Sequence, residues 1–258
     1  MKPVDLADAL SQIPLHIWNR IVEKEPEWRY MHDLLEPWGF GRFAVLMVAA
    51  GLNDFQLKGK AEIAYWLKIR ELINRKKIPD SLRDFEAVLT EFYAQERLPE
   101  LKLRRLRRFF SSRLAESLWS STPESVAKNF IRIWYDLASV MGQERSAKTI
   151  TFAMKCSGIA LLMAGETNFD FERIPILVDY RVREFTKRLG VGVRDDEDVR
   201  KFWNSVLGEI KKSVDINMIH LDSLIWQIGV LSGEEIVEYF ARLGLKDLGG
   251  RIVEVLVK

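Results

Sequence analysis

The sequence predicts an all-α protein built from about a dozen short helices. Between residues 101 and 114, apolar side chains recur at a spacing that places them on one stripe of a helix, while arginines cover the rest of its surface. Segments of this kind are separated by proline and glycine at helix-ending positions. The Asn-Gly and Asp-Gly pairs typical of β-hairpin turns do not occur in the sequence.

Composition is that of a folded globular chain. The 258 residues include 39 Lys+Arg and 37 Asp+Glu, a net charge of +2, and 48% are hydrophobic, which argues against disorder. The longest apolar runs, residues 44–52 and 156–164, are shorter than the ~20 residues of a membrane-spanning helix. Acidic residues near the start argue against a signal peptide. We therefore expect a cytoplasmic protein without a membrane span.

Cysteine and histidine are scarce. Cys156 is the one cysteine, so no internal disulfide can form, and a reducing compartment is expected. His16, His32 and His220 do not sit at the spacing of zinc ligands. Neither a metal nor an organic cofactor is predicted.

Two helix starts and one long loop organise the middle of the chain. Thr122-Pro123 combines a capping hydroxyl with a proline in the first turn, which predicts a helix running to about Ser139. Residues 165–177 lack helix signals, and a loop of that length commonly has a function. Asp179 then begins a helix that should reach about Leu189.

Two lysines stand out in the otherwise apolar segment 147–164. Lys148 and Lys155 are seven residues apart and so lie on one helix face, with Phe152 between them. Both ammonium groups could reach solvent from the helix edge. Alternatively they line an apolar pocket, where each positive charge favours the neutral, nucleophilic amine of the other.

Acidic residues offer two further candidates. Asp179 could simply cap its helix, or serve as an anion that positions a lysine. Asp222 and Trp226 are four apart and adjacent on a helix surface. Trp226 could be a core residue with Asp222 solvated, or the pair could hold a planar purine.

Three segments together resemble a known family. Residues 147–155, 174–182 and 220–226 are similar in sequence and order to the archaeal 8-oxoguanine DNA glycosylases called AGOG, of the helix-hairpin-helix DNA glycosylase superfamily. The resemblance is strongest from about residue 122 to 229. It implies a helix-hairpin-helix DNA glycosylase fold with two lobes around a central cleft, formed by residues 1–258 as a single domain. Residues 122–189 would hold the two arms, the hairpin at 140–146, the long loop and the helix of Asp179.

The resemblance also implies the site. Lys148 occupies the position of the catalytic lysine and Asp179 that of the catalytic aspartate. Four residues match the base pocket, with aromatic Phe152 and Trp226 to stack on the base and polar Lys155 and Asp222 at its edge. Two more positions are filled by Glu27, where the family has glutamine, and by either Tyr65 or Trp66, of which we favour Trp66.

The implied function is excision of 8-oxoguanine from DNA by a glycosylase that is also an AP lyase, through a Schiff base on Lys148 and β-elimination. The expected partner is double-stranded DNA carrying 8-oxoguanine, with single strands left open, and no membrane or obligate protein partner. The alternatives are a helix-hairpin-helix protein that binds DNA without cutting it, and a helical scaffold without a nucleic-acid role. The basic run 102–108 could be a solvated helix face or a flank of the DNA surface.

Overall fold

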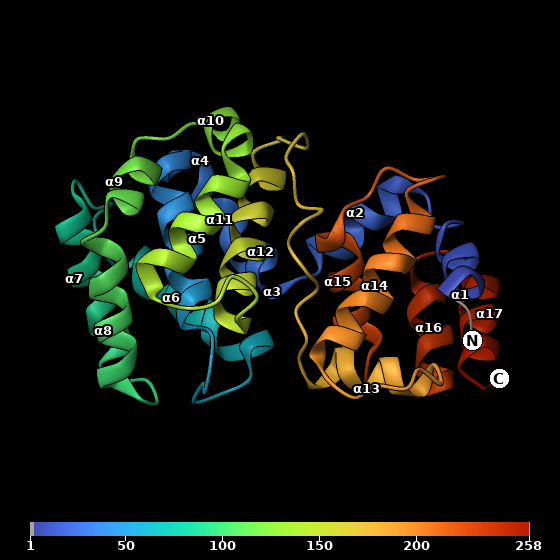
Figure 1. The fold of residues 1–258 in the computed structure, drawn as a ribbon. Helices are drawn as coiled ribbons and strands as arrows, with labels where there is room; N and C mark the ends of the chain where they lie inside the picture. Colours follow the sequence, from blue (N-terminus) through green and yellow to red (C-terminus); the bar gives the residue numbers. More distant parts are fainter. Residues whose placement is uncertain (1–2, 258) are drawn as a thin grey trace. The chain divides into compact units, whose positions relative to one another are not determined.

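The computed structural model describes residues 3–257, and the chain divides into two compact units. Unit 1 combines the two ends of the chain, Met1–Glu23 and Ile174–Lys258, and unit 2 is the continuous segment Lys24–Arg173. The described residues form helices and no strand, so the all-α prediction is confirmed. The helices run from α1 to α17, which is more than the dozen expected (Figure 1).

Unit 2 contains ten α-helices and two single turns among its residues. They are α3 (Pro26–Met31), a 3-10 turn (His32–Leu34), α4 (Leu35–Trp38), α5 (Phe40–Asn53), a π turn (Ala61–Tyr65), α6 (Trp66–Asn74), α7 (Leu82–Tyr93), α8 (Pro99–Phe110), α9 (Arg113–Trp119), α10 (Pro123–Lys128), α11 (Phe130–Met141) and α12 (Lys148–Met163).

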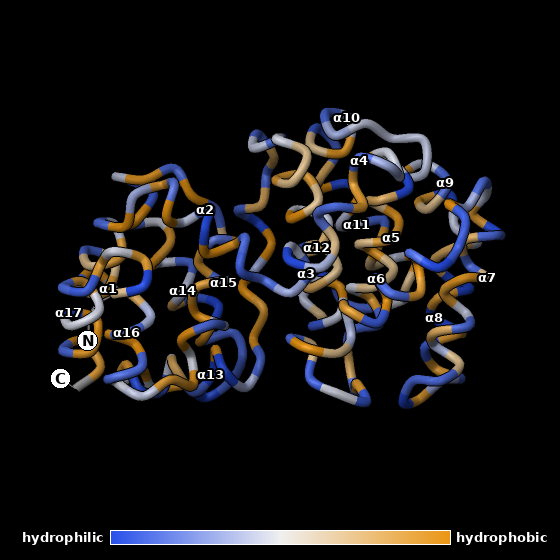
Figure 2. Tube along the Cα trace, turned by 180° about the vertical axis from the view of Figure 1, so that it is seen from behind, coloured by the Kyte–Doolittle hydropathy of each residue, from blue (hydrophilic) through white to orange (hydrophobic). Residues whose placement is uncertain are grey.

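Helices α5 and α12 form the core of unit 2. Residues 43–53 of α5 are all buried, consistent with the apolar colouring of much of this helix in Figure 2. The two backbones approach closely at Gly51, where an added Cβ would lie 2.8 Å from the Ala153 Cα and 2.9 Å from the Cys156 Sγ. A side chain at this position would therefore force the helices apart. The end of α5 is therefore fixed against the middle of α12 by this contact.

The helix predicted from Thr122 is two helices. The Thr122 side chain accepts a hydrogen bond from the Ser125 backbone N–H (3.3 Å), as the capping prediction required. The helix breaks at Asn129, whose side-chain amide donates to the Ser125 carbonyl at 2.8 Å. Asparagine competes in this way with the helical hydrogen-bond pattern, which explains the interruption. The prediction of one continuous helix to Ser139 was wrong, and α11 continues to Met141.

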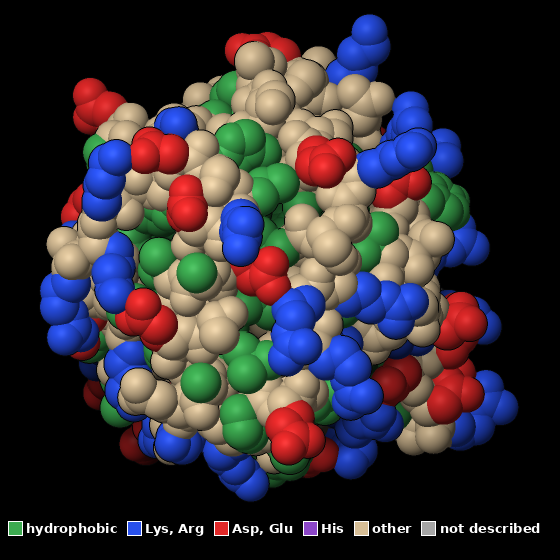
Figure 3. All heavy atoms as spheres, turned by 90° about the vertical axis from the view of Figure 1, so that its left-hand side faces the viewer, with side chains coloured by type: hydrophobic (Ala, Val, Ile, Leu, Met, Phe, Trp, Pro, Cys, Tyr) green, Lys and Arg blue, Asp and Glu red, His purple; other side chains and the backbone are tan. Residues whose placement is uncertain are grey.

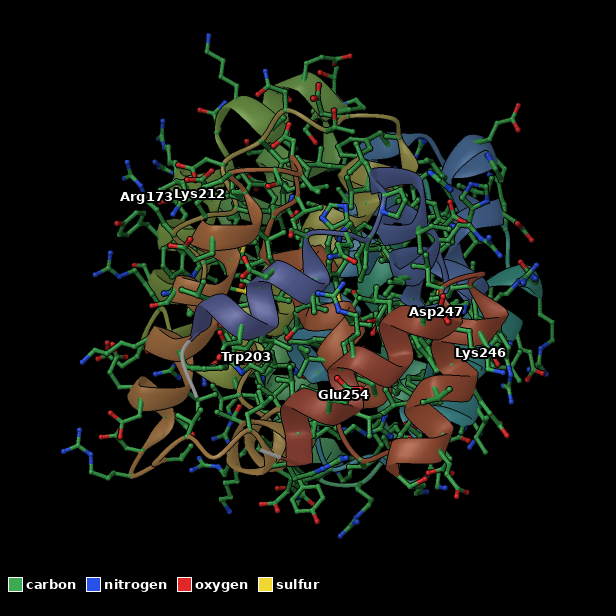
Figure 4. The ribbon with its side chains drawn as sticks, turned by 90° about the vertical axis from the view of Figure 1, so that its right-hand side faces the viewer. Arg173, Trp203, Lys212, Lys246, Asp247 and Glu254 are labelled. Atoms are coloured by element: carbon green, nitrogen blue, oxygen red, sulfur yellow. The ribbon has the colours of Figure 1, made fainter. Side chains whose placement is uncertain are left out.

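Unit 1 contains α1 (Pro3–Leu10), α2 (Leu15–Glu23), α13 (Tyr180–Arg188), α14 (Asp196–Ile210), α15 (Met218–Ile228), α16 (Gly233–Arg242) and α17 (Lys246–Val257). Helix α15 is buried over most of its length and packs against α2, α13 and α14. Figure 4 shows the side of unit 1 covered by α17, with Trp203 of α14 among the helices. Trp203 is fully buried, and its indole N–H donates to the Thr186 hydroxyl at 2.9 Å.

No helix among the described residues has the length and apolar character needed to cross a membrane.

Candidate active site

A hairpin joins α11 to α12 and leads directly to Lys148. Helix α11 ends at Gly142, which has the left-handed φ of 59° that glycine tolerates best. The Arg108 guanidinium lies against this glycine, 3.0 Å from where a Cβ would be. The Trp134 indole N–H donates to the Arg145 carbonyl at 2.9 Å. The hairpin is therefore held from both sides within unit 2.

Arg105 of α8 ties the hairpin to the start of α12. Its guanidinium donates to the Leu52 carbonyl at 3.0 Å, to the Gln143 side-chain oxygen at 2.9 Å and to the Thr149 hydroxyl at 3.0 Å. The Thr149 hydroxyl in turn donates to Gln143 at 3.1 Å. A planar guanidinium can serve several acceptors in a fixed geometry. Because Thr149 follows Lys148, this network fixes the backbone that carries Lys148.

Lys148 is the first residue of α12, and its side chain is exposed. Its exposure agrees with the first of the two alternatives, an ammonium group that reaches solvent from the helix edge. A residue at the first position of a helix projects from the edge of the core instead of into it.

Lys155 is one turn after Phe152 and is buried, with 4% of its side chain exposed. Its ammonium lies 3.3 Å from the Glu25 Oε1, and Glu25 is also buried. The Glu25 carboxylate therefore offsets the positive charge of Lys155. Phe152 is half-buried on the same helix.

Glu27 lies two residues after Glu25, at the start of α3. Only 3% of Glu27 is exposed, and its Oε2 has no hydrogen-bond partner among the described residues. Burial and the nearby Glu25 carboxylate raise the pKa of Glu27 well above its usual value, against the opposing effect of Lys155. A second carboxyl group thus shares the surroundings of the Lys155 and Glu25 ion pair.

Asp54 follows α5 and accepts a hydrogen bond from the Trp66 indole N–H at 3.2 Å. Burial raises the pKa of Asp54 to about 7, although the Trp66 hydrogen bond and the positive charges of Lys102 and Lys148 act in the opposite direction. This electrostatic influence places Asp54 in the neighbourhood of Lys148 within unit 2.

The choice between Tyr65 and Trp66 remains a prediction, and the two rings have different neighbours. Both are buried and pack edge to face, with ring centroids 5.5 Å apart. The Tyr65 hydroxyl is engaged with the Ala50 carbonyl and the Tyr93 hydroxyl, each at 2.8 Å. Trp66 contacts Asp54, and through it the neighbourhood of Lys148. These contacts favour Trp66.

In unit 1, Asp179 caps α13. Its Oδ1 accepts a hydrogen bond from the Val182 backbone N–H at 2.9 Å, and the side chain is half-buried. The predicted helix start at this residue is confirmed. The remaining lone pairs leave the carboxylate able to accept a further donor.

Asp222 of α15 supports the segment that leads to Asp179. Its Oδ1 accepts a hydrogen bond from the Leu177 backbone N–H at 3.2 Å, and 3% of the residue is exposed. The interpretation of Asp222 as a solvated surface acid was wrong, because neighbouring helices cover the face of α15 that carries it. Asp222 therefore helps to fix the backbone two residues before Asp179.

Trp226 is half-buried on the same helix and contacts Arg181 of α13. The Arg181 guanidinium carbon lies 4.2 Å from the centroid of the indole, and the guanidinium donates to the Trp226 carbonyl at 3.3 Å. Gly229 permits this approach, since a Cβ there would lie 2.8 Å from the Arg181 carbonyl oxygen. One face of the indole is therefore covered by a cation.

The basic run 102–108 is only partly a surface feature. Lys102 is fully buried, 3.6 Å from Glu96 and 5.2 Å from the Phe55 ring centroid, and Arg105 serves the network described above. Arg104, Arg107 and Arg108 are exposed. Figure 3 shows the face that includes α7 to α9, where basic side chains are mixed with acidic ones. The run thus supplies three exposed arginines and two structural cations.

Comparison with known proteins decides the family. The family model described as AGOG, N-glycosylase/DNA lyase, matches residues 7–254. The chain belongs to the AGOG family. An N-glycosylase/DNA lyase from Methanopyrus kandleri is 30% identical over 79% of this chain and 79% of its own length. A second, from Thermococcus kodakarensis, is 27% identical over 72% of this chain and 67% of its own length.

A solved structure shows the same fold. The 8-oxoguanine DNA glycosylase from Pyrobaculum aerophilum, in complex with 8-oxoguanosine, has a TM-score of 0.75 and 21% sequence identity to this AGOG chain. The match covers 96% of this chain and 95% of the other. The predicted glycosylase fold is confirmed by this likeness.

Four residues of this AGOG protein were not singled out from the sequence. Glu25, Asp54, Arg105 and Arg181 are brought to the candidate site residues by tertiary packing within their units. Arg105 belongs to the basic run 102–108, but the sequence of that run did not indicate which of its arginines face the interior and which face solvent. Glu25 had a usable signal, since a lone lysine in an apolar helix requires a buried acid elsewhere.

Proposed function

We propose that this AGOG protein is a bifunctional glycosylase and AP lyase that removes 8-oxoguanine from DNA. Family membership carries the proposal, together with the position of Lys148 directly after the hairpin and of Asp179 at the start of α13. The related Pyrobaculum aerophilum enzyme was solved with 8-oxoguanosine, which supports the choice of base. Since the substrate is genomic DNA, the site of action is the cytoplasm.

In the proposed reaction, the neutral amine of Lys148 attacks C1′ of the damaged nucleotide. The new C1′–N bond forms as the glycosidic bond breaks, and the departing base takes the bonding electrons and a proton. The ionised Asp179 carboxylate orients the amine, accepts its proton and stabilises positive charge on the sugar. Cleavage of the C1′–O4′ bond, with a proton passed to O4′, then opens the sugar ring and leaves an imine. The imine acidifies the C2′ proton, and its loss expels the 3′ phosphate.

The amine of Lys148 must lose its proton before it can attack. The bound DNA strand supplies the exclusion of water that the exposed side chain otherwise lacks. Arg105 contributes indirectly, because it holds Thr149 and the hairpin in one arrangement.

Recognition of the base is assigned to six residues. Phe152 and Trp226 supply aromatic faces for stacking, Lys155 and Asp222 supply polar groups at the edge of the base, and Trp66 and Glu27 fill the two remaining positions. The enzyme must first turn the nucleotide out of the duplex, which costs a few kcal/mol. Backbone amides of the hairpin and exposed arginines of α8 bind phosphates without reading sequence, so affinity should fall as salt rises.

Borohydride trapping tests the nucleophile. With a duplex containing 8-oxoguanine, reduction should leave a covalent protein–DNA adduct for the parent protein and none for Lys148→Gln. Lys128→Gln, which changes an exposed lysine of α10, is the matched control and should trap like the parent. Trapping by Lys148→Gln at the parental level would refute the assignment. If the parent binds DNA in a salt-sensitive way but releases no base, the result would favour the alternative of a helix-hairpin-helix protein that binds DNA without cutting it.

A further inference from the structure

Unit 2 buries more negative than positive charge around Lys155. Glu25, Glu27 and Lys155 are each no more than 4% exposed. The single ammonium lies 3.3 Å from Glu25 Oε1, while Glu27 Oε2 has no hydrogen-bond partner among the described residues. One lysine cannot neutralise two carboxylates, and an uncompensated negative charge is unfavourable in buried surroundings.

The other groups that act on Glu27 do not restore the balance. Asp54, at the end of α5, adds a further acidic group, and its hydrogen bond takes up the Trp66 indole N–H. Cys156, beside Lys155 on α12, is a buried thiol whose pKa is raised, mainly by burial, and it supplies no positive charge. Among the described residues, Lys155 is the cation named among the main influences on the pKa of Glu27. Glu25, Glu27 and Lys155 together can be neutral only if one of the two glutamates carries a proton.

We propose that Glu27 acts on the substrate as a neutral carboxylic acid, and that Glu25 is a positioning residue that holds Lys155 and thereby leaves the proton on Glu27. This inference rests on the proposed function, because it assigns Glu27 to the base pocket. Burial and Glu25 raise the pKa of Glu27, which agrees with the charge count.

A neutral carboxyl group and a carboxylate recognise different partners. The neutral acid has one donor and one acceptor side by side, whereas the carboxylate only accepts. The donor and acceptor match a lactam edge, in which a carbonyl oxygen lies beside an N–H, as at O6 and N1 of 8-oxoguanine. A carboxylate would instead repel that carbonyl oxygen. Glu27 would then bind the base as an amide side chain does, but only while it keeps its proton.

Binding should consequently weaken in alkali. As pH rises above the pKa of Glu27 in the folded protein, affinity for the lactam edge should fall by up to about tenfold per pH unit. The neutral isostere Glu27→Gln keeps one donor and one acceptor and cannot ionise. Its affinity should equal that of the parent within about threefold below that pKa, and should fall less than the parent's affinity above it.

The test measures binding of free 8-oxoguanosine by tryptophan fluorescence from pH 5 to pH 9 in the full-length protein. Glu27→Gln also reports any titration of the nucleoside itself. Glu116→Gln, an exposed acid of α9, is the control and should follow the parent curve. The same pH profile for the parent and Glu27→Gln would overturn the proposal. So would a loss of more than tenfold in affinity for Glu27→Gln at pH 5.

A direct readout separates this proposal from the function it rests on. In protein labelled with ¹³C at the glutamate carboxyl carbon, the Glu27 resonance should report a neutral acid at pH 7. Glu25→Gln removes the neighbouring carboxylate that raises the pKa of Glu27, so the Glu27 resonance should move toward that of a carboxylate and nucleoside affinity at pH 7 should drop. An ionised Glu27 in the parent at pH 7 overturns the inference. A neutral Glu27 in a protein that fails to excise 8-oxoguanine would refute the proposed function alone.

Discussion

Unit 1 and unit 2 both bury acidic side chains, but they satisfy them with different partners. In unit 1, Asp179 and Asp222 each accept a hydrogen bond from a backbone N–H, at 2.9 Å and 3.2 Å. In unit 2, Glu25 pairs with a lysine, while burial raises the pKa values of Glu27 and Asp54. Backbone amides stabilise a carboxylate without bringing in a second charge. Crowded carboxylates must instead find a cation or take up a proton.

The stabilities of the two units consequently depend on pH in opposite ways. Burial lowers the pKa of His220 in unit 1 to about 4, so this group makes unit 1 less stable as pH falls. The raised pKa of Asp54 in unit 2 has the opposite effect, so this group makes unit 2 less stable as pH rises. Single substitutions can therefore test the contrast in each unit separately.

Asp179→Asn should have the largest effect, and on activity alone. Asparagine caps a helix about as well as aspartate, so stability should change by only a few tenths of a kcal/mol. Base release should fall by about 10²- to 10⁴-fold, because the amide cannot accept a proton. Single-turnover excision and urea unfolding measure the two quantities. Normal excision by this variant would reduce Asp179 to a helix cap.

Lys155→Met should destabilise unit 2 by about 3–5 kcal/mol at pH 7, because it leaves Glu25 buried without its cation. The double variant Lys155→Met/Glu25→Gln should recover part of that loss. Lys68→Met, at an exposed position of α6, is the matched control. Denaturant midpoints report the changes. If Lys155→Met cost no more than the control, the ion pair would contribute nothing to the fold.

His220 should make the parent lose about 3 kcal/mol between pH 7 and pH 4. Its pKa is depressed in the folded state, so the stability it contributes is present above the unfolded value of 6.5 and is lost as pH falls toward about 4. The neutral ring contacts Asn19 at 3.2 Å and accepts from the Asn217 N–H at 3.3 Å. His220→Gln should flatten the acid limb of the stability curve, while the exposed His16→Gln should not.

Asp54 should give a smaller effect of opposite sign, about 2 kcal/mol after allowance for its half-buried position. Its pKa is raised, so the parent should lose stability as pH rises from about 4 toward about 7. Asp54→Asn removes the ionisation and should flatten this part of the curve. Glu116→Gln again serves as the exposed control, and unfolding midpoints at four pH values suffice. Identical slopes for the parent and Asp54→Asn would show that Asp54 does not titrate in this range.

Local features were well predicted from the sequence. The all-α class, the cap at Thr122, the loop before Asp179 and the cap at Asp179 all depend on residues close together in the chain. The break at Asn129 was missed, because hydrophobic periodicity continues across it while a side-chain hydrogen bond interrupts the backbone.

Long-range partners were not predicted, for a physical reason. Lys155 meets Glu25 across 130 positions of the chain, and no local pattern encodes that contact. Exposure was also left open by the sequence. Lys148 could have reached solvent or lined an apolar pocket and is exposed, whereas Asp222 could have been a surface acid and is buried. Periodicity assigns residues to a helix face, but the neighbouring helices decide which faces are covered.

The network around Arg105 has a mechanical consequence. Helix α8, the end of α5, the hairpin and the second residue of α12 share a single guanidinium, so they cannot shift independently. In the proposed enzyme, a DNA strand bound at the hairpin would therefore lie at a fixed distance from the Lys148 amine. Arg105 would thereby fix both the position of the protein along the DNA strand and the distance from that strand to the Lys148 amine, without contacting the DNA or Lys148.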